Sequence, residues 1–129
     1  MTDLLSDEWL AQLAQRGAEL PEVEGASMVC QYEIAEAPEG KVRFYLVWSN
    51  GRLVEAAKGK HKASDTMFAA KAADFVEVLD VTKEAEVAFM QGRLKVDGDY
   101  RRWLVDLVDW RTHPDLVALW KEMVRLTTS

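Results

Sequence analysis

The sequence predicts an α+β fold, because strand patterns dominate residues 28–60 and helical patterns dominate much of the chain after them. Residues 41–48 are rich in β-branched and aromatic side chains, which favour strands. The Asn50-Gly51 pair that follows is typical of a tight hairpin turn, in which both central residues need a positive φ. After residue 99, apolar side chains recur at the three- and four-residue spacing of amphipathic helices.

The first expected element is a helix over residues 6–17. Ser6 is a suitable N-cap, because its hydroxyl can accept a hydrogen bond from a free amide of the first turn. Acids occupy that turn, where the helix dipole favours them, and Gly17 ends the element. The side chains that would share its apolar face are Trp9, Leu10, Leu13 and Ala14.

Three strands are expected next, over residues 28–37, 41–48 and 52–60. Tight turns join them in sequence, so they form an antiparallel meander. In the middle strand, alternation places one set of apolar side chains on a single face. That set is Val42, Phe44, Leu46 and Trp48.

Residues 65–79 fit two descriptions. Their apolar side chains have helical spacing throughout, but residues 66–69 could also form a fourth strand before a shorter helix. Periodicity alone leaves both open.

The segment from residue 82 to Asp99 predicts several short elements. A helix over 82–91 would end at Gly92, which can adopt the left-handed C-cap conformation without steric cost. Residues 93–96 alternate polar and apolar, as in a strand with one buried face. Asp97-Gly98 predicts a turn, and Asp99 could cap a following helix.

Two amphipathic helices are expected at the C-terminal end. The first follows Asp99, and its apolar stripe is Tyr100, Trp103, Leu104, Leu107 and Val108. The second covers residues 114–126, with Pro114 well placed at the first helical position. Its stripe is Leu116, Val117, Trp120, Met123 and Val124.

Length and composition predict one domain over residues 1–129, large enough for a hydrophobic core. The single Cys30 excludes an internal disulfide and fits a reducing compartment. The N-terminus carries acids where a signal peptide would carry bases, and no apolar run is long enough to span a membrane. We therefore expect a cytoplasmic protein with no integral membrane segment.

The net charge of −6 is concentrated near the N-terminus, where residues 1–40 hold nine acids and one base. Nucleic-acid binding depends on neutralising phosphates, so we expect no nucleic-acid partner. His61 and His113 lack metal-ligand spacing, and the phosphate-loop, calcium-loop and nucleophile-elbow patterns do not match. The sequence therefore predicts no catalytic residues, no metal and no cofactor, and a protein that is not an enzyme.

The run Phe-Met-Gln-Gly-Arg-Leu-Lys-Val-Asp-Gly-Asp at residues 89–99 resembles a pattern of the sterol carrier protein (type two) family, its small bacterial members in particular. In that family a helix ending in Phe/Leu-Met-x-Gly leads into Lys/Arg-Leu-Lys-Val-x-Gly-Asp. Residues 63–70 are similar to a family strand, and residues 73–76 to the helix start after it. The resemblance covers about residues 28–108 and favours a strand followed by a helix within residues 65–79.

The resemblance implies a five-stranded, mainly antiparallel sheet covered by helices on one side, with an apolar cavity between them. It also implies non-enzymatic binding and transfer of a sterol, fatty acid or fatty acyl-CoA. Lys71 and residues 82–86 depart from the family pattern. The helix over residues 114–126 is absent from many short relatives and is a candidate lid.

The candidate cavity-lining residues are apolar or aromatic side chains near this sheet and these helices. Plain core packing is the alternative for each of them, and a protein-interaction or homodimer role of the last helix is the alternative function. The candidates are Phe44, Leu46, Phe75, Phe89, Met90, Leu94, Trp103, Leu107, Trp120 and Met123.

Overall fold

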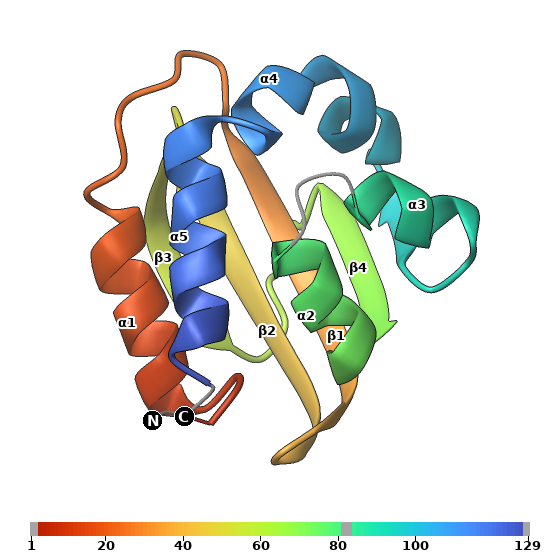
Figure 1. Ribbon diagram of the computed structural model, residues 1–129. Coiled ribbons are helices and arrows are strands. Elements are labelled where there is room, and N and C mark those ends of the chain that lie inside the picture. Colours follow the sequence, from red (N-terminus) through yellow and green to blue (C-terminus); the bar gives the residue numbers. More distant parts are fainter. Residues whose placement is uncertain (1–2, 81–83, 128–129) are drawn as a thin grey trace.

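A computed structural model describes residues 3–80 and 84–127 of the chain (Figure 1). The elements follow the order helix, four strands, two helices, one strand and a helical C-terminal part. Their bounds are α1 (Asp7–Gly17), β1 (Met28–Ala37), β2 (Gly40–Ser49), β3 (Arg52–Lys58), β4 (Thr66–Lys71), α2 (Ala72–Asp80), α3 (Glu84–Met90), β5 (Lys95–Gly98), η1 (Arg102–Asp106), α4 (Val108–Arg111) and α5 (Pro114–Arg125).

The five strands form one sheet with the order β3-β2-β1-β4-β5. The β1–β4 pair is parallel, and the other three pairs are antiparallel. The predicted fold class, α+β with a five-stranded and mainly antiparallel sheet, is confirmed. The expected meander of β1, β2 and β3 is also confirmed.

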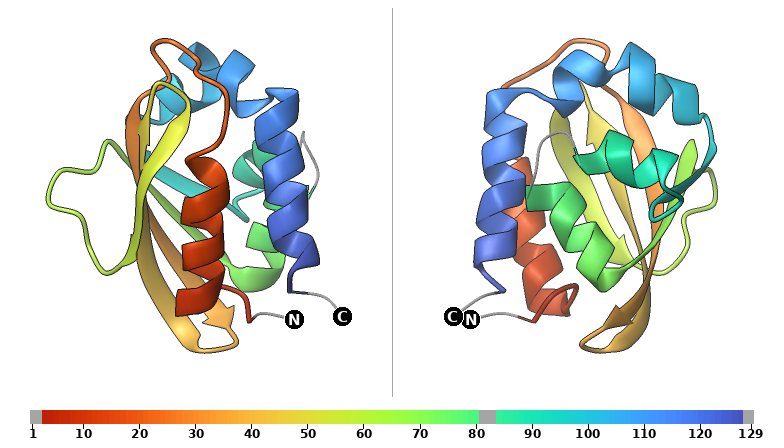
Figure 2. Two further views of the ribbon diagram at one scale, coloured as in Figure 1. Left: turned by 90° about the vertical axis from the view of Figure 1, so that its left-hand side faces the viewer. Right: turned by 45° about the vertical axis from the view of Figure 1, so that its right-hand side comes forward.

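Helices α1, α2 and α5 lie on the same face of the sheet (Figure 2). The alternation predicted for β2 is confirmed, because its four apolar side chains on that face are at most 5% exposed. They are Val42, Phe44, Leu46 and Trp48. The main core therefore lies between the sheet and this layer of helices.

Glycine and asparagine occupy the left-handed positions that the sequence indicated at two turns. Asn50 and Gly51 have φ of 47° and 83° between β2 and β3, and Gly92 has φ of 76° after α3. The predicted strand over residues 93–96 begins two residues later, at Lys95. Asp97-Gly98 is not the predicted turn, because both residues pair with β4 as part of β5.

Residues 66–80 form β4 and then α2, as the family resemblance implied. Parallel pairing with β1 gives β4 a strand environment, and Phe68 lies opposite Tyr32 in that register. The predicted helix over 82–91 corresponds to α3, and the first residues of that prediction, 82 and 83, lie outside the described residues.

The chain is helical after Asp99, as predicted, but it does not form a single regular α-helix. The chain instead forms the π-helical turn η1, closed by the Leu107 amide donating to the Arg102 carbonyl at 2.8 Å, followed by the short α4. Two carbonyl groups of this segment accept hydrogen bonds from a side chain. The Arg111 guanidinium donates to the carbonyls of Trp103 and Leu104 at 3.2 and 3.1 Å. Side-chain contacts from α4 therefore stabilise a form that the spacing of apolar residues does not predict.

Candidate functional site

An apolar cavity of about 70 Å³ lies between the sheet and the helices. Strands β1, β2 and β4 contribute one wall, and α2, η1, α4 and α5 contribute the others. Its lining residues are Cys30, Tyr32, Trp48, Phe68, Phe75, Val78, Leu79, Leu94, Trp103, Trp110, Arg111, Leu116, Val117 and Trp120. Apart from one guanidinium, one hydroxyl and one thiol, the side chains are aliphatic or aromatic.

The sheet side of the cavity is a stack of rings. Tyr32 lies between Phe44 and Phe68, parallel to both, with ring centroids 4.6 and 4.9 Å away. Phe75 of α2 approaches Tyr32 edge-on at 5.9 Å. Such contacts add to the energy of area burial, so this wall is firmly packed.

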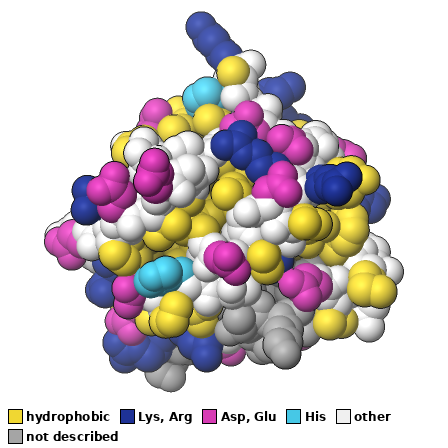
Figure 3. Space-filling view, turned by 90° about the horizontal axis from the view of Figure 1, so that it is seen from above, with side chains coloured by type: hydrophobic (Ala, Val, Ile, Leu, Met, Phe, Trp, Pro, Cys, Tyr) yellow, Lys and Arg dark blue, Asp and Glu magenta, His cyan; other side chains and the backbone are white. Residues whose placement is uncertain are grey.

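Four of the five tryptophans line the other part of the cavity. Trp48 of β2 meets Trp110 and Trp120 edge-on, at 5.1 and 6.1 Å between centroids. Trp103 of η1 packs edge-on against Phe68 at 4.8 Å. Figure 3 views the molecule from the α4 end, and hydrophobic side chains come to the surface in the middle of this face, between charged ones.

Arg111 is the charged residue among the lining residues. Its guanidinium lies over the Trp103 ring at 4.8 Å, and Nη2 also donates to Glu86 Oε1 at 3.0 Å. The Arg111 side chain is only 8% exposed. A cation is therefore held in an otherwise apolar wall by a ring, two carbonyl groups and one carboxylate.

The Cys30 thiol and the Tyr32 hydroxyl are buried in the sheet wall. Burial raises the pKa of Cys30 from 9.0 to about 12, opposed by the hydrogen bond from Thr66, whose Oγ1 lies 3.8 Å from Cys30 Sγ. Burial likewise raises the pKa of Tyr32 well above 10. Both groups are neutral at physiological pH and unsuited to nucleophilic attack.

Alkaline pH should destabilise the fold through Cys30. Between pH 9 and pH 12 the unfolded thiol ionises while the folded thiol stays protonated, so this residue's contribution is complete below pH 9. Above pH 9 it falls by about 1.4 kcal/mol per pH unit. Urea unfolding of the wild type and of Cys30→Ala from pH 8 to 10.5 measures the difference, since Tyr32 titrates in both. If the free energy of unfolding falls equally with pH in the two proteins, Cys30 is not the source of the alkaline destabilisation.

Four of the ten candidate residues named from the sequence line this cavity. They are Phe75, Leu94, Trp103 and Trp120. They come from α2, the approach to β5, η1 and α5, so the tertiary structure brings together residues up to 45 positions apart. Their contact with a ligand stays a prediction.

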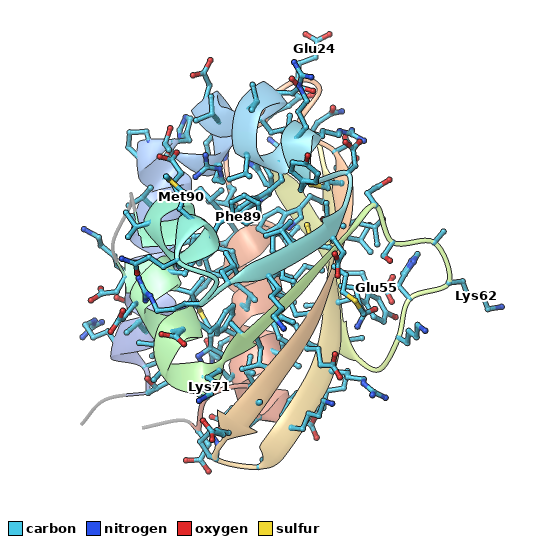
Figure 4. The ribbon with its side chains drawn as sticks, turned by 90° about the vertical axis from the view of Figure 1, so that its right-hand side faces the viewer. Glu24, Glu55, Lys62, Lys71, Phe89 and Met90 are labelled. Atoms are coloured by element: carbon cyan, nitrogen blue, oxygen red, sulfur yellow. The ribbon has the colours of Figure 1, made fainter. Side chains whose placement is uncertain are left out.

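The other six candidates lie outside the cavity lining. Phe44, Leu46 and Met123 are fully buried in the core, and Phe89 and Leu107 are half-buried against it. Met90 is 85% exposed at the end of α3, where Figure 4 labels it beside Phe89. Helical spacing placed Met90 next to apolar neighbours, but α3 is a short helix at the margin of the molecule.

Ten lining residues were not among the candidates. Cys30, Tyr32 and Trp48 could have been found by strand alternation, since they share the buried face of β1 and β2. Arg111 had no such signal, because an arginine after a predicted amphipathic helix is ordinarily solvated. The remaining six are Phe68, Val78, Leu79, Trp110, Leu116 and Val117.

Helix α5 packs its apolar stripe inside this chain. Leu116, Met123 and Val124 are buried, while Val117 and Trp120 are half-buried and line the cavity. A homodimer through this helix stays a prediction. Within residues 3–80 and 84–127, no helix is long and apolar enough to cross a membrane.

The chain is similar in fold to several solved structures. Sterol carrier protein 2 aligns with a TM-score of 0.70 and 18% identity, over 93% of this chain and 98% of that one. A conserved hypothetical protein from Thermus thermophilus aligns with a TM-score of 0.67 and 17% identity, over 95% of this chain and 91% of that one. Palmitated SCP2L2 from Aedes aegypti aligns with a TM-score of 0.56 and 19% identity, over 84% of this chain and 96% of that one.

A search of curated protein sequences found no match to this chain. Residues 7–103, however, match the profile of the SCP-2 sterol transfer family, and they include α1, the whole sheet and the start of η1. The match covers well over half of the chain. On this match, the chain belongs to the SCP-2 sterol transfer family.

Proposed function

We propose that this single-domain protein binds an apolar, lipid-like ligand in the cavity and transfers it without catalysing a reaction. A sterol, a fatty acid or a fatty acyl-CoA is the expected cargo. The observation that carries the proposal is the apolar cavity between sheet and helices in a chain of the SCP-2 family. The palmitated state of the similar Aedes aegypti protein supports a lipid ligand.

The lining is suited to a ligand held mainly by the hydrophobic effect. Each buried methylene group contributes about 0.8 kcal/mol, so an acyl chain needs few directional contacts to bind tightly. Binding pockets of this kind combine an apolar lining with a small number of polar groups. Aromatic and aliphatic side chains from seven elements provide such a surface.

The cavity must widen to hold such a ligand. Its volume of about 70 Å³ is well below the roughly 300–1,000 Å³ typical of ligand pockets. Helix α5 contributes Leu116, Val117 and Trp120 to the wall, and it can shift without breaking the hydrogen bonds of the sheet. The proposal therefore assigns α5 the role of a lid that ligand binding displaces.

Native mass spectrometry of the gently purified protein tests the function. We expect one bound molecule per chain after incubation with a sterol, a long-chain fatty acid or an acyl-CoA. A protein that retains none of the three would contradict the proposal.

A cavity-filling substitution should weaken lipid binding while leaving the fold intact. Val117→Trp adds a large ring to the cavity wall, whereas Ala118→Trp adds the same ring to the exposed face of α5. We expect isothermal titration calorimetry to show at least about a tenfold loss of fatty-acid affinity for the first variant, since several methylene contacts are lost. The second should bind like the wild type. Equal fatty-acid affinities of the two variants would show that the ligand binds outside this cavity.

A further inference from the structure

Two hydrogen-bond donors in the cavity wall have no acceptor. Arg111 Nη1 and Trp110 Nε1 are both buried and without a partner among the described residues. Both residues belong to α4, and both line the cavity. Buried polar groups in folded proteins are nearly always paired, so two unpaired donors at one cavity indicate an acceptor that the described residues do not supply.

The guanidinium of Arg111 is already held in place by its other nitrogens. Nε donates to the Trp103 carbonyl, and Nη2 donates to the Leu104 carbonyl and to Glu86. These contacts leave Nη1 as the unpaired group of a fixed cation. The Glu86 side chain is 50% exposed, so its charge is partly screened by solvent and offsets that of Arg111 only in part.

Among the described residues, no group accepts a hydrogen bond from either donor. None of the fourteen lining residues is an acid, an amide or a small hydroxyl residue, and the two lining side chains that can accept a hydrogen bond are the Cys30 thiol and the Tyr32 hydroxyl. Tyr32 and Thr66 already interact with the Cys30 thiol. A ligand that enters the cavity can therefore supply the acceptor.

A carboxylate fits this requirement better than a neutral head group. Its two oxygens accept hydrogen bonds and donate none, so they can satisfy both Arg111 and Trp110. Its negative charge also complements the guanidinium, and charge-assisted hydrogen bonds are about twice as strong as neutral ones. A lone hydroxyl group does not offset the buried positive charge.

We propose that the cavity selects amphipathic acids, a long apolar chain ending in a carboxylate, over neutral lipids, with the carboxylate bound by Arg111 Nη1 and Trp110 Nε1. This selectivity rests on the proposed function. Both anchoring residues lie beyond the family match at residues 7–103. The preference for acids is therefore a property of this chain's own C-terminal part.

Calorimetric titration of the full chain with dodecanoic acid and with methyl dodecanoate tests the selectivity, because the ester keeps the chain and removes the charge. We expect the wild type to bind the acid at least about tenfold more tightly than the ester, the effect of a charged hydrogen bond. Trp110→Phe keeps an aromatic ring at this position and removes the donor, so it should weaken acid binding about three- to tenfold more than it weakens ester binding. Arg111→Gln should remove the preference for the acid.

The outcomes separate this inference from the proposed function. Equal affinity of the wild type for acid and ester would overturn the selectivity while leaving lipid binding intact. Loss of affinity for both ligands to the same extent in Trp110→Phe would overturn the anchoring role. Binding of neither ligand by the wild type would count against the proposed function as well. Arg111 also supports η1, so circular dichroism is needed to check that Arg111→Gln is folded. The ratio of acid to ester affinity in the wild type, and the effect of Trp110→Phe, test the inference independently of that variant.

Discussion

Gly98→Ala is expected to destabilise the protein by on the order of 3 kcal/mol or more. Gly98 has φ of 82°, and a Cβ atom there would lie 2.5 Å from the Asp65 carbonyl oxygen and 3.3 Å from Thr66 Cα. These are backbone atoms at the start of β4, and the same carbonyl accepts from the Asp99 amide at 2.9 Å. Relief of the overlap therefore requires β5 to move away from its partner strand. Urea unfolding followed by tryptophan fluorescence measures the loss.

Gly92→Ala is the matched control. Gly92 has nearly the same conformation, with φ of 76°, but a Cβ atom there would meet no atom within 4 Å. Its expected cost is the conformational strain alone, about 1–2 kcal/mol. If the two variants lose equal stability, the contact with Asp65 is not the cause. The comparison separates the cost of a left-handed residue from the cost of a close approach between strands.

Trp9→Ala is expected to cost about 3–5 kcal/mol, the range for removing a large buried aromatic side chain. Trp9 of α1 is 0% exposed, and its Nε1 donates to the Met123 carbonyl at 3.0 Å. That carbonyl lies in the last turn of α5, where carbonyl groups lack intrahelical partners. The ring therefore fills the core and joins the first helix to the last. Thermal and urea unfolding report the combined loss.

Trp9→Phe separates the hydrogen bond from the packing. It keeps much of the apolar volume and removes the donor, so about 1–2 kcal/mol of the loss should remain. A phenylalanine variant as unstable as the alanine variant would show that the hydrogen bond, and not the buried ring, dominates. Because α5 forms part of the cavity wall, both variants should also weaken fatty-acid binding, with alanine the more severe.

Local chemistry was sufficient to predict most secondary structure. The alternation in β2 needed only a strand with one buried face, and Asn50-Gly51 needed only a turn with positive φ. Each of these patterns reflects forces between residues that are close in sequence. The family resemblance was needed at residues 65–79, where β4 is a strand because it pairs with β1, 36 positions earlier in register.

The candidate site was predicted less well. Many apolar side chains are buried, and only those whose surface is left uncovered by other side chains line the cavity. Phe44 and Phe75 have the same hydrophobic character, and both are almost fully buried. Only the second lines the cavity, since the first is covered by its stacked neighbour Tyr32. Hydrophobicity indicates that a side chain is buried, but it does not indicate whether the side chain packs against another residue or faces the cavity.

The sequence by itself determined the fold class, the strands of the meander, the first and last helices and the family resemblance at residues 89–99. Tertiary structure alone decided that η1 and α4 replace a regular helix, that Arg111 enters an apolar wall, and that Met90 stays outside. The physical reason is the range of the interactions. Turns, caps and alternation arise between near neighbours, whereas the guanidinium is positioned by a ring, two carbonyl groups and the carboxylate of Glu86, 25 residues away.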